Sequence, residues 1–176
     1  MFVLNIKSYP NFLSNEEHEY VIAKTLKGNT WVFNGSSIED KFTFWYMELM
    51  DDEFFTKHML NKIEVATDTK FKLDRVYANG QTYGLPGSYH RDVETDITDV
   101  YKTFLYYVNL YWDYQWGGST FFYQEDKNYN QLFIPNNGVL FDSTIYHAGL
   151  EPTRHCKELR VTVAFKLTEE KNGIRI

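Results

Sequence analysis

Apolar residues follow two different periods along this chain. In the stretch that begins at Asp51, the apolar residues Phe55, Met59, Ile63 and Ala66 recur every three or four residues, which places them on one face of a helix. After residue 70, short runs of β-branched and aromatic residues are separated by Gly, Pro, Asn or Asp, the pattern of strands joined by turns. We therefore expect a helical region followed by a β region.

Further elements are predicted before residue 51. Residues 2–7 and 41–49 are rich in aromatic and branched side chains and suit strands. Ser14 and Glu17 have the spacing of a capping box, in which each side chain bonds a backbone N–H that the first helical turn leaves unpaired. We expect a helix over residues 15–26.

Six short segments after residue 70 suit strands: FKLDRVYA, VYKTFLYYVNLYW, GGSTFFY, QLFI, GVLFD and LRVTVAFKL. No helical pattern separates the later ones, which disfavours a βαβ sheet. The sequence predicts a mainly β fold with flanking helices (α+β): a barrel or jelly roll (double-stranded β-helix) with an N-terminal helical layer over one face. Without internal repeats or Pro/Gly/Ser-rich linkers, residues 1–176 are expected to form a single domain.

Charge and composition limit the expected classes of binding partner and the expected location of the protein. The 24 acidic and 18 basic side chains give a net charge of -6, which opposes attraction to phosphate backbones and anionic membranes. Nucleic acid is therefore disfavoured as a partner. With no cationic leader, no long apolar run and a single cysteine, Cys156, we expect a cytoplasmic, intracellular protein without a signal peptide or a membrane segment.

Two separated stretches carry candidate metal ligands. In YHRDVE, His90 and Asp92 project to the same side of an extended backbone. His147 follows in FDSTIYHAG, and His155, in the charged turn EPTRHCKE, is its rival. Two imidazoles and one carboxylate can hold non-haem Fe(II) with three positions open, although zinc would accept the same donors.

Arg160 begins a strand with two contrasting faces. Arg160, Thr162 and Ala164 share one face, while the opposite face is wholly apolar. The apolar face must meet the helical layer or the other sheet, so the arginine face should line the interior, where a guanidinium needs an anion. This predicts a pocket for an organic acid beside the metal. Arg154 is the competing arginine, but it lies in a turn segment.

The order His90-x-Asp92, His147 and Arg160 resembles the Fe(II) and 2-oxoglutarate-dependent dioxygenases, in particular their prolyl-4-hydroxylase-like branch. RVYANGQTYG resembles that branch's segment before the first ligand. FLYYVNLYWDYQWGGSTFF resembles its tyrosine strand and double-glycine turn, and PNFLSNEE the start of its first helix. The resemblance covers residues 10–167.

The resemblance implies an enzyme with Fe(II) at His90, Asp92 and His147. It further implies 2-oxoglutarate as cosubstrate, with its distal carboxylate on Arg160, and O2 as oxidant; ascorbate is an optional addition. Three further residues are implied around the cosubstrate: Tyr107, Thr162 and Tyr77. Tyr107 also suits plain core packing in an aromatic-rich strand.

One segment departs from the family's pattern. GLPGSY stands between Tyr83 and His90, where the family passes quickly to its first ligand. This longer loop at the edge of the metal site bears on the assignment of Tyr77 and Tyr83 and on substrate access.

Three functions from different classes fit these features. The first is a hydroxylase acting on a C–H bond of a prolyl or other amino-acid residue, or of a small metabolite, which predicts protein, peptide or small-molecule partners. The second is an AlkB-type nucleic-acid demethylase, which the net charge disfavours. The third is a non-catalytic jelly-roll binding module holding zinc or no metal.

Overall fold

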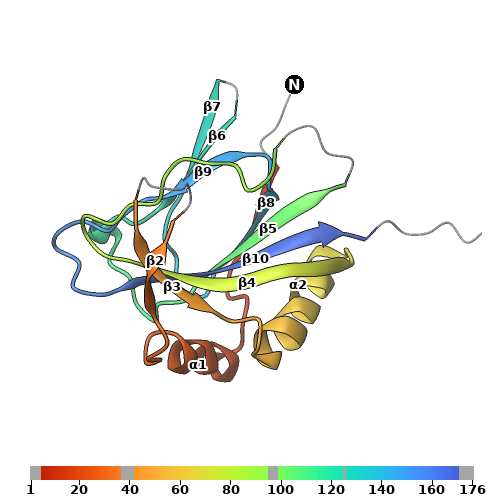
Figure 1. Ribbon diagram of the computed structural model, residues 1–176, viewed down its shortest axis with the longest axis horizontal. Helices are drawn as coiled ribbons and strands as arrows, with labels where there is room; N and C mark the ends of the chain where they lie inside the picture. Colours follow the sequence, from red (N-terminus) through yellow and green to blue (C-terminus); the bar gives the residue numbers. More distant parts are fainter. Residues whose placement is uncertain (1–4, 37–41, 95–98, 125, 171–176) are drawn as a thin grey trace, which may run out of the picture.

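Two antiparallel sheets form the core of the computed structural model, which describes residues 5–36, 42–94, 99–124 and 126–170 (Figure 1). The large sheet has the strand order β1-β8-β5-β10-β4-β3-β2, and the small sheet β7-β6-β9. The strands are β1 Ile6–Tyr9, β2 Val32–Gly35, β3 Phe44–Glu48, β4 Phe71–Gln81, β5 Tyr101–Tyr107, β6 Thr120–Gln124, β7 Lys127–Gln131, β8 Gly138–Asp142, β9 Tyr146–Gly149 and β10 Arg160–Glu169. This is the expected mainly β jelly roll.

Helices cover the outer face of the large sheet (Figure 1). They are α1 Asn15–Lys24, the π-helix η1 Phe54–Met59 and α2 Leu60–Thr67, while a 3₁₀ turn, η2 Tyr114–Trp116, lies elsewhere. Val161, Val163 and Phe165 of β10 are fully buried in one cluster with Met59 and Ile63. The apolar face of β10 therefore meets the helical layer, as predicted. None of the described helices is long and apolar enough to cross a membrane.

The opposite face of the large sheet turns toward the small sheet. Ala164 of β10 packs there in a second cluster with Tyr107, Phe122 and Phe141. Central strand β10 pairs with both β4 and β5, so its inward side chains lie between theirs. This arrangement gathers the inner faces of three strands around one interior space.

Helix α1 starts as predicted, whereas the helical stretch predicted from Asp51 begins with η1 at Phe54. Ser14 caps α1 in a complete capping box with Glu17, and the helix ends at Lys24, two residues before the predicted end. The second helical stretch begins with the wider turns of a π-helix, which keep Phe55 and Met59 buried. Ala66, predicted on the apolar face, is exposed.

The strand prediction for QLFI is wrong. Strand β7 is the polar segment Lys127–Gln131, which pairs with β6, and only Gln131 of QLFI belongs to it. Of the three apolar residues of QLFI, Leu132 and Ile134 are exposed, and Phe133 is buried against Trp112 and Tyr107. The apolar run thus reflects one anchoring ring rather than a strand.

Other strand limits also shifted. The short strands β2 and β9 were not predicted. In the predicted strand over residues 2–7, residues 2–4 lie outside the described residues, as does residue 41 of the strand predicted over 41–49.

The Glu17 carboxylate links α1 to the second helical region. It accepts bonds from the Ser14 N–H, from His58 Nε2 at 2.6 Å and from Lys62 Nζ at 2.7 Å. Burial raises the pKa of Glu17, but these bonds outweigh burial and lower it from 4.5 to about 2. The ionised carboxylate therefore stabilises the fold above pH 4.5, and this contribution is lost as the pH falls toward 2.

We expect Glu17→Gln to reduce the free energy of unfolding by about 1–2 kcal/mol at pH 7. The difference from the wild type should shrink as the pH falls from 4.5 toward 2, because only the wild type loses a charge there. Urea unfolding at a series of pH values measures this. A difference that stayed constant across that range would contradict the role of the ionised carboxylate.

Candidate metal centre and adjoining pocket

The backbone brings the two ligand-bearing stretches together. His90 and His147 pair directly across an antiparallel bridge, with both N–H groups bonded to the partner's carbonyl at 3.0 and 2.9 Å. The Asp92 N–H bonds the Ser143 carbonyl at 2.9 Å, which continues the pairing. The segment from His90 to Asp92 thus lies alongside β9, at the edge of the small sheet.

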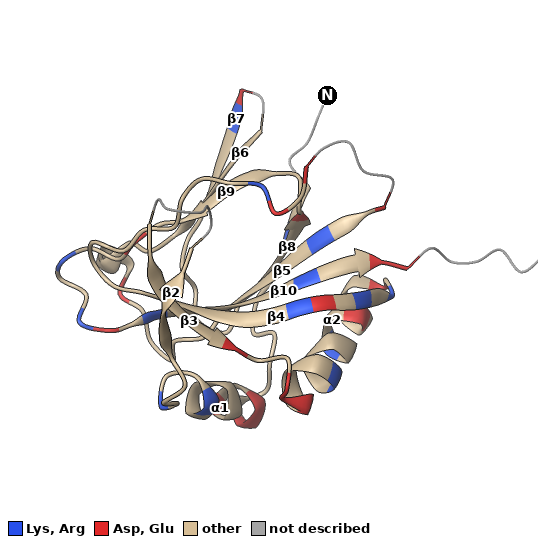
Figure 2. Cartoon of the chain, viewed as in Figure 1, with Lys and Arg blue, Asp and Glu red and all other residues tan. Residues whose placement is uncertain are grey.

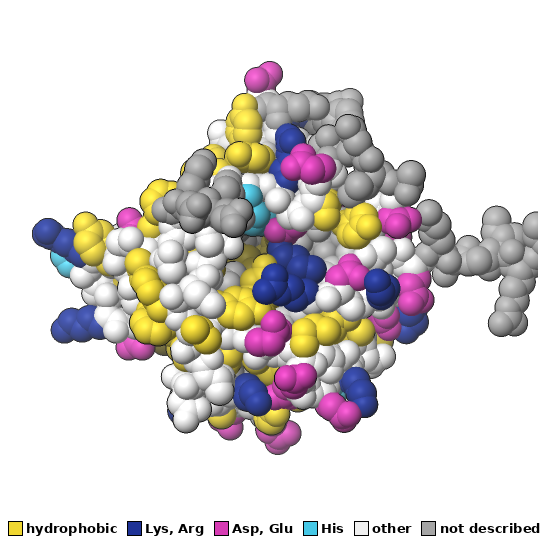
Figure 3. All heavy atoms as spheres, in the orientation of Figure 1, with side chains coloured by type: hydrophobic (Ala, Val, Ile, Leu, Met, Phe, Trp, Pro, Cys, Tyr) yellow, Lys and Arg dark blue, Asp and Glu magenta, His cyan; other side chains and the backbone are white. Residues whose placement is uncertain are grey.

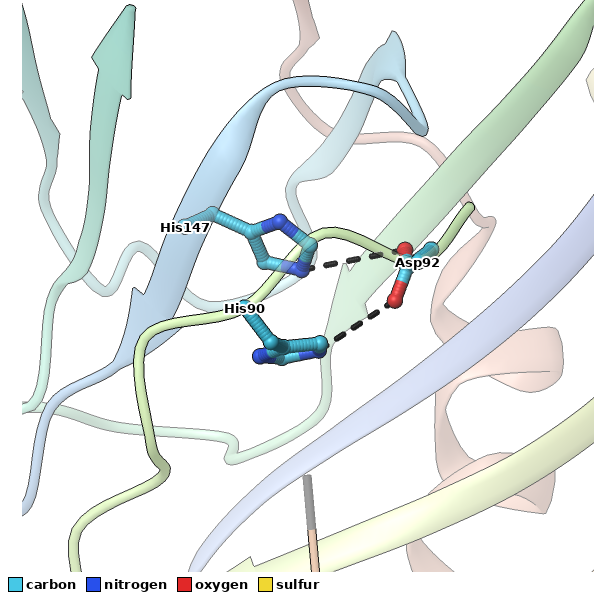
Figure 4. Close-up of side chains that lie close together, drawn as sticks. All are labelled: His90, Asp92 and His147. Carbon is cyan, nitrogen blue, oxygen red and sulfur yellow. Dashed lines mark ion pairs between the residues drawn. The ribbon is translucent and has the colours of Figure 1, made fainter. Parts of the chain in front are cut away.

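Three side chains converge from this pairing (Figure 4). One ligand atom from each of His90, Asp92 and His147 lies within 4.8 Å of the others. Asp92 Oδ1 is 3.2 Å from His90 Nε2, and Asp92 Oδ2 is 3.7 Å from His147 Nε2. The rival His155 lies in an exposed turn and is not part of this cluster.

Hydrogen bonds to the far ring nitrogens orient both imidazoles. His90 Nδ1 lies 2.8 Å from the Ser88 carbonyl oxygen, and His147 Nδ1 lies 2.9 Å from that of Ile145. A carbonyl oxygen can only accept, so each Nδ1 carries the proton and each Nε2 presents a lone pair toward Asp92. Burial lowers the pKa of His147 to about 4, which keeps this ring neutral at neutral pH. Two lone pairs and a carboxylate facing one point fit a bound cation.

Asp92 also has a basic neighbour. Its Oδ2 accepts a bond from the Thr103 hydroxyl and lies 2.5 Å from Lys166 Nζ. Burial raises the pKa of Asp92, but the charge of Lys166 and its bond to the carboxylate outweigh burial and hold this pKa well below its usual range. The carboxylate is therefore ionised, with Oδ2 held by Thr103 and Lys166 and Oδ1 turned toward His90.

A cavity of about 650 Å³ adjoins the triad. Its walls come from the small sheet and from the inner faces of β4, β5 and β10. Arg160 and Thr162 lie in its lining together with all three candidate ligands. The candidate metal ligands and the arginine predicted beside them thus line one cavity.

The Arg160 guanidinium is buried, with 1% of the residue exposed. Its Nε donates to the Gly118 carbonyl at 2.6 Å, Nη1 to Gln81 Oε1 at 2.6 Å and Nη2 to Thr120 Oγ1 at 3.3 Å. These bonds use three of the five N–H donors of a guanidinium.

Every acceptor around Arg160 is neutral. No carboxylate among the described residues forms an ion pair with it. Burial lowers the pKa of Arg160 to about 10, which still leaves the guanidinium charged at neutral pH. A buried, unpaired cation with spare donors beside a cavity is suited to bind an anion.

The remaining predicted residues divide into two groups. Tyr77 lines the cavity, as Thr162 does. Tyr107 is fully buried behind the lining, and its hydroxyl donates to Thr120 Oγ1 at 2.8 Å, so it reaches the Arg160 environment only through Thr120. Tyr83 is 62% exposed and lies outside the lining, as does Arg154.

Sequence reasoning missed four residues that shape the site: Gln81, Thr103, Thr120 and Lys166. Lys166 continues the alternation of Arg160, Thr162 and Ala164, so extending the same two-residue period would have found it. No local signal marks Thr103 or Thr120, because their roles depend on strand pairing.

Solved structures share this fold at low sequence identity. One is a prolyl hydroxylase from Trichoplax adhaerens, in complex with a peptide fragment of the hypoxia inducible factor oxygen degradation domain. Its sequence is 17% identical, its TM-score is 0.76, and the match covers 95% of this chain and 84% of that chain. The viral collagen prolyl hydroxylase of Paramecium Bursaria Chlorella virus-1, in a 2-oxoglutarate complex, is 16% identical with a TM-score of 0.67, covering 93% and 95%. HygX from Streptomyces hygroscopicus, with nickel, 2-oxoglutarate and hygromycin B bound, is 12% identical with a TM-score of 0.69, covering 94% and 83%.

No protein-family model matches the chain, and no curated protein matches it. The chain has the jelly-roll fold of prolyl hydroxylases and other non-haem 2-oxoglutarate-dependent oxygenases, which confirms the predicted resemblance at the level of the fold.

We expect His147→Ala to weaken Mn(II) binding at least about 100-fold, because it removes one of three converging donors. Isothermal titration calorimetry of the metal-free protein measures this. The matched control is His155→Ala, which removes a histidine from the exposed turn and should bind Mn(II) as the wild type does. Unchanged affinity in a folded His147→Ala variant would show that the triad does not hold the metal.

Proposed function

We propose that this protein is an Fe(II)- and 2-oxoglutarate-dependent dioxygenase that hydroxylates a C–H bond and releases succinate and CO2. His90, Asp92 and His147 hold the iron, and Arg160 binds the distal carboxylate of 2-oxoglutarate. The observation that carries this proposal is the buried Arg160, which has no carboxylate partner among the described residues and lines the same cavity as the metal triad.

The triad alone does not distinguish iron from zinc, because both accept two imidazoles and a carboxylate. Arg160 favours an oxygenase, since a small dicarboxylate that chelates the metal at one end places its other end beside a cation. The structural neighbours support this choice: one is described in complex with 2-oxoglutarate, and HygX is described with bound iron in one structure and with nickel and 2-oxoglutarate in another.

Each part of the pocket has a distinct task. The Nδ1–H bonds to the Ser88 and Ile145 carbonyls fix both imidazoles with Nε2 toward the metal. Gln81 and the Gly118 carbonyl hold the guanidinium plane in place, so little ordering remains when the carboxylate binds. Apolar walls from Leu105, Phe141 and Ala164 limit water around the reacting groups.

When bound, the iron supplies the oxidative chemistry, coupling the decarboxylation of 2-oxoglutarate by O2 to oxidation of the substrate. The chain supplies the charges and the geometry. The neighbours are described with a peptide fragment and with the small molecule hygromycin B. We therefore place the substrate of this protein among amino-acid side chains and small molecules.

The proposal is tested with anaerobically prepared protein loaded with Fe(II) and 2-oxoglutarate and then exposed to O2. We expect succinate to form with matching consumption of O2. A screen of amino acids, peptides and small metabolites should find compounds that stimulate this turnover and gain one oxygen in mass. Stoichiometric zinc, together with no succinate after Fe(II) and 2-oxoglutarate are added, would favour the non-catalytic binding module instead.

Arg160→Lys tests the cosubstrate assignment. Lysine keeps the charge but loses the planar fork that donates two parallel bonds to a carboxylate. We expect the apparent KM for 2-oxoglutarate to rise at least about tenfold, which corresponds to about 1.4 kcal/mol. Mn(II) affinity, measured by calorimetry, should change little. An unchanged 2-oxoglutarate requirement would place the cosubstrate elsewhere.

A further inference from the structure

Basic side chains gather on the inner faces of β4 and β10 near the rim of the cavity. Figure 2 shows basic segments side by side on these two strands, and Figure 3 shows basic side chains grouped at the centre of the same face. Arg75 of β4 and Lys166 of β10 both line the cavity. The metal and cosubstrate assignments leave Arg75 without a role.

Arg75 and Lys166 are direct partners across the antiparallel β4–β10 pair. Side chains at such positions project from the same face, and like charges directly opposite each other are destabilising. Both members of this like-charged pair line the cavity. Lys166 is balanced by Asp92 at 2.5 Å, whereas Arg75 forms no ion pair with any carboxylate in the part of the chain that the structure describes.

Aromatic rings hold the two cations in position. The Arg75 guanidinium carbon lies 4.7 Å from the centre of the Tyr77 ring and 5.4 Å from that of Tyr46, and Nη2 donates to the Tyr46 hydroxyl at 3.0 Å. Lys166 Nζ lies 5.9 Å from the centre of the same Tyr77 ring. Arg75 is thus fixed by neutral groups, as Arg160 is, and most of its donors stay available.

The charge of the Glu48 carboxylate acts on Arg75, but the hydrogen bonds of Glu48 go to other groups. Glu48 accepts the Tyr46 hydroxyl and the backbone N–H groups of Leu49 and Met50, and it does not line the cavity. A third arginine stands elsewhere in the lining: Arg91 lies between the two ligands of its segment, with its guanidinium carbon 5.5 Å from the Tyr146 ring centre.

The formal charges of the cavity lining do not balance. Among the described residues, the cations of the lining are Arg75, Arg91, Arg160 and Lys166, and the carboxylates are Asp74 and Asp92. A divalent metal and a 2-oxoglutarate dianion carry opposite and equal charges, so binding both leaves this excess unchanged. Arg75 and Arg91 are exposed at the cavity wall, where an anionic group of the substrate can reach them.

We propose that the rim of the cavity, with Arg75 as its principal contact, binds an anionic oxygen group of the substrate. The substrate is then a small molecule that carries a carboxylate or a phosphate and presents its C–H bond to the metal. This inference rests on the proposed function and narrows its substrate class. A small ligand suits a cavity of about 650 Å³. A long polyanion is disfavoured by the net charge of -6.

Inorganic phosphate serves as the probe. In protein loaded with Mn(II) and saturating 2-oxoglutarate, phosphate bound near the metal has its ³¹P relaxation accelerated by the unpaired electrons of Mn(II). We expect a saturable effect in the wild type and a half-saturating concentration at least about fivefold higher in Arg75→Gln, as loss of one charge contact implies. Arg75→Lys should restore most of the affinity.

The matched control is Arg154→Gln, which removes the same charge from an exposed turn outside the cavity and should leave phosphate binding unchanged. Acetate that displaces phosphate at similar concentrations would identify a carboxylate as the preferred group. Equal half-saturation in Arg75→Gln and wild type would overturn the inference, as would a phosphate effect that disappears once 2-oxoglutarate is saturating.

Two other results have separate meanings. A single-stranded oligonucleotide that binds far more tightly than phosphate and depends on Arg75 would replace the small-molecule substrate by a nucleic acid. Failure to bind Mn(II) or 2-oxoglutarate would overturn the proposed function. Calorimetric titration of phosphate into the metal-free variants would then still test the anion site. Equal phosphate affinity in Arg75→Gln and Arg154→Gln would contradict the proposed anion site.

Discussion

The burial of a charged guanidinium among neutral acceptors is the constraint on which the pocket depends. Arg160 stands on the central strand of the large sheet, and its side chain is held by Gln81 of β4, the Gly118 carbonyl and Thr120 of β6. Those contacts link the two sheets around one cation. A buried charge without a counter-ion is costly unless a ligand completes it. The interior is therefore suited to bind an anion, next to three side chains that could hold a metal.

Much of the fold follows from local sequence signals. The two-residue period of β10 correctly assigns Val161 and Val163 to the helical layer and Arg160 to the interior, because a strand in a two-layer structure has two distinct environments. The capping box likewise locates the start of α1. The prediction failed for β7, where a polar strand is stabilised by pairing with β6 while the neighbouring apolar run lies outside it. An edge strand of this kind is stabilised by pairing with a distant segment, so its own sequence does not predict it.

In the candidate site, too, some features follow from local sequence and others depend on tertiary pairing. His90, Asp92 and His147 converge as their residue types and order suggested, and their pairing is set by backbone bonds that the sequence does not display. Tyr107, predicted at the cosubstrate, is fully buried, and its hydroxyl donates to Thr120, which also accepts a bond from Arg160; its role at the cosubstrate stays a prediction. Thr103 and Thr120 act through neighbours that are distant in sequence, which explains why composition and spacing missed them. Lys166 was predictable from the alternation that revealed Arg160.

Diffraction from crystals grown without oxygen in the presence of Fe(II) and 2-oxoglutarate tests the central claim most directly, with anomalous data collected at the iron absorption edge. We expect a single strong anomalous peak between His90 Nε2, His147 Nε2 and Asp92, and density for 2-oxoglutarate whose distal carboxylate meets the free donors of Arg160. An iron peak away from these three side chains would contradict the account. So would a cosubstrate whose distal carboxylate leaves Arg160 unpaired.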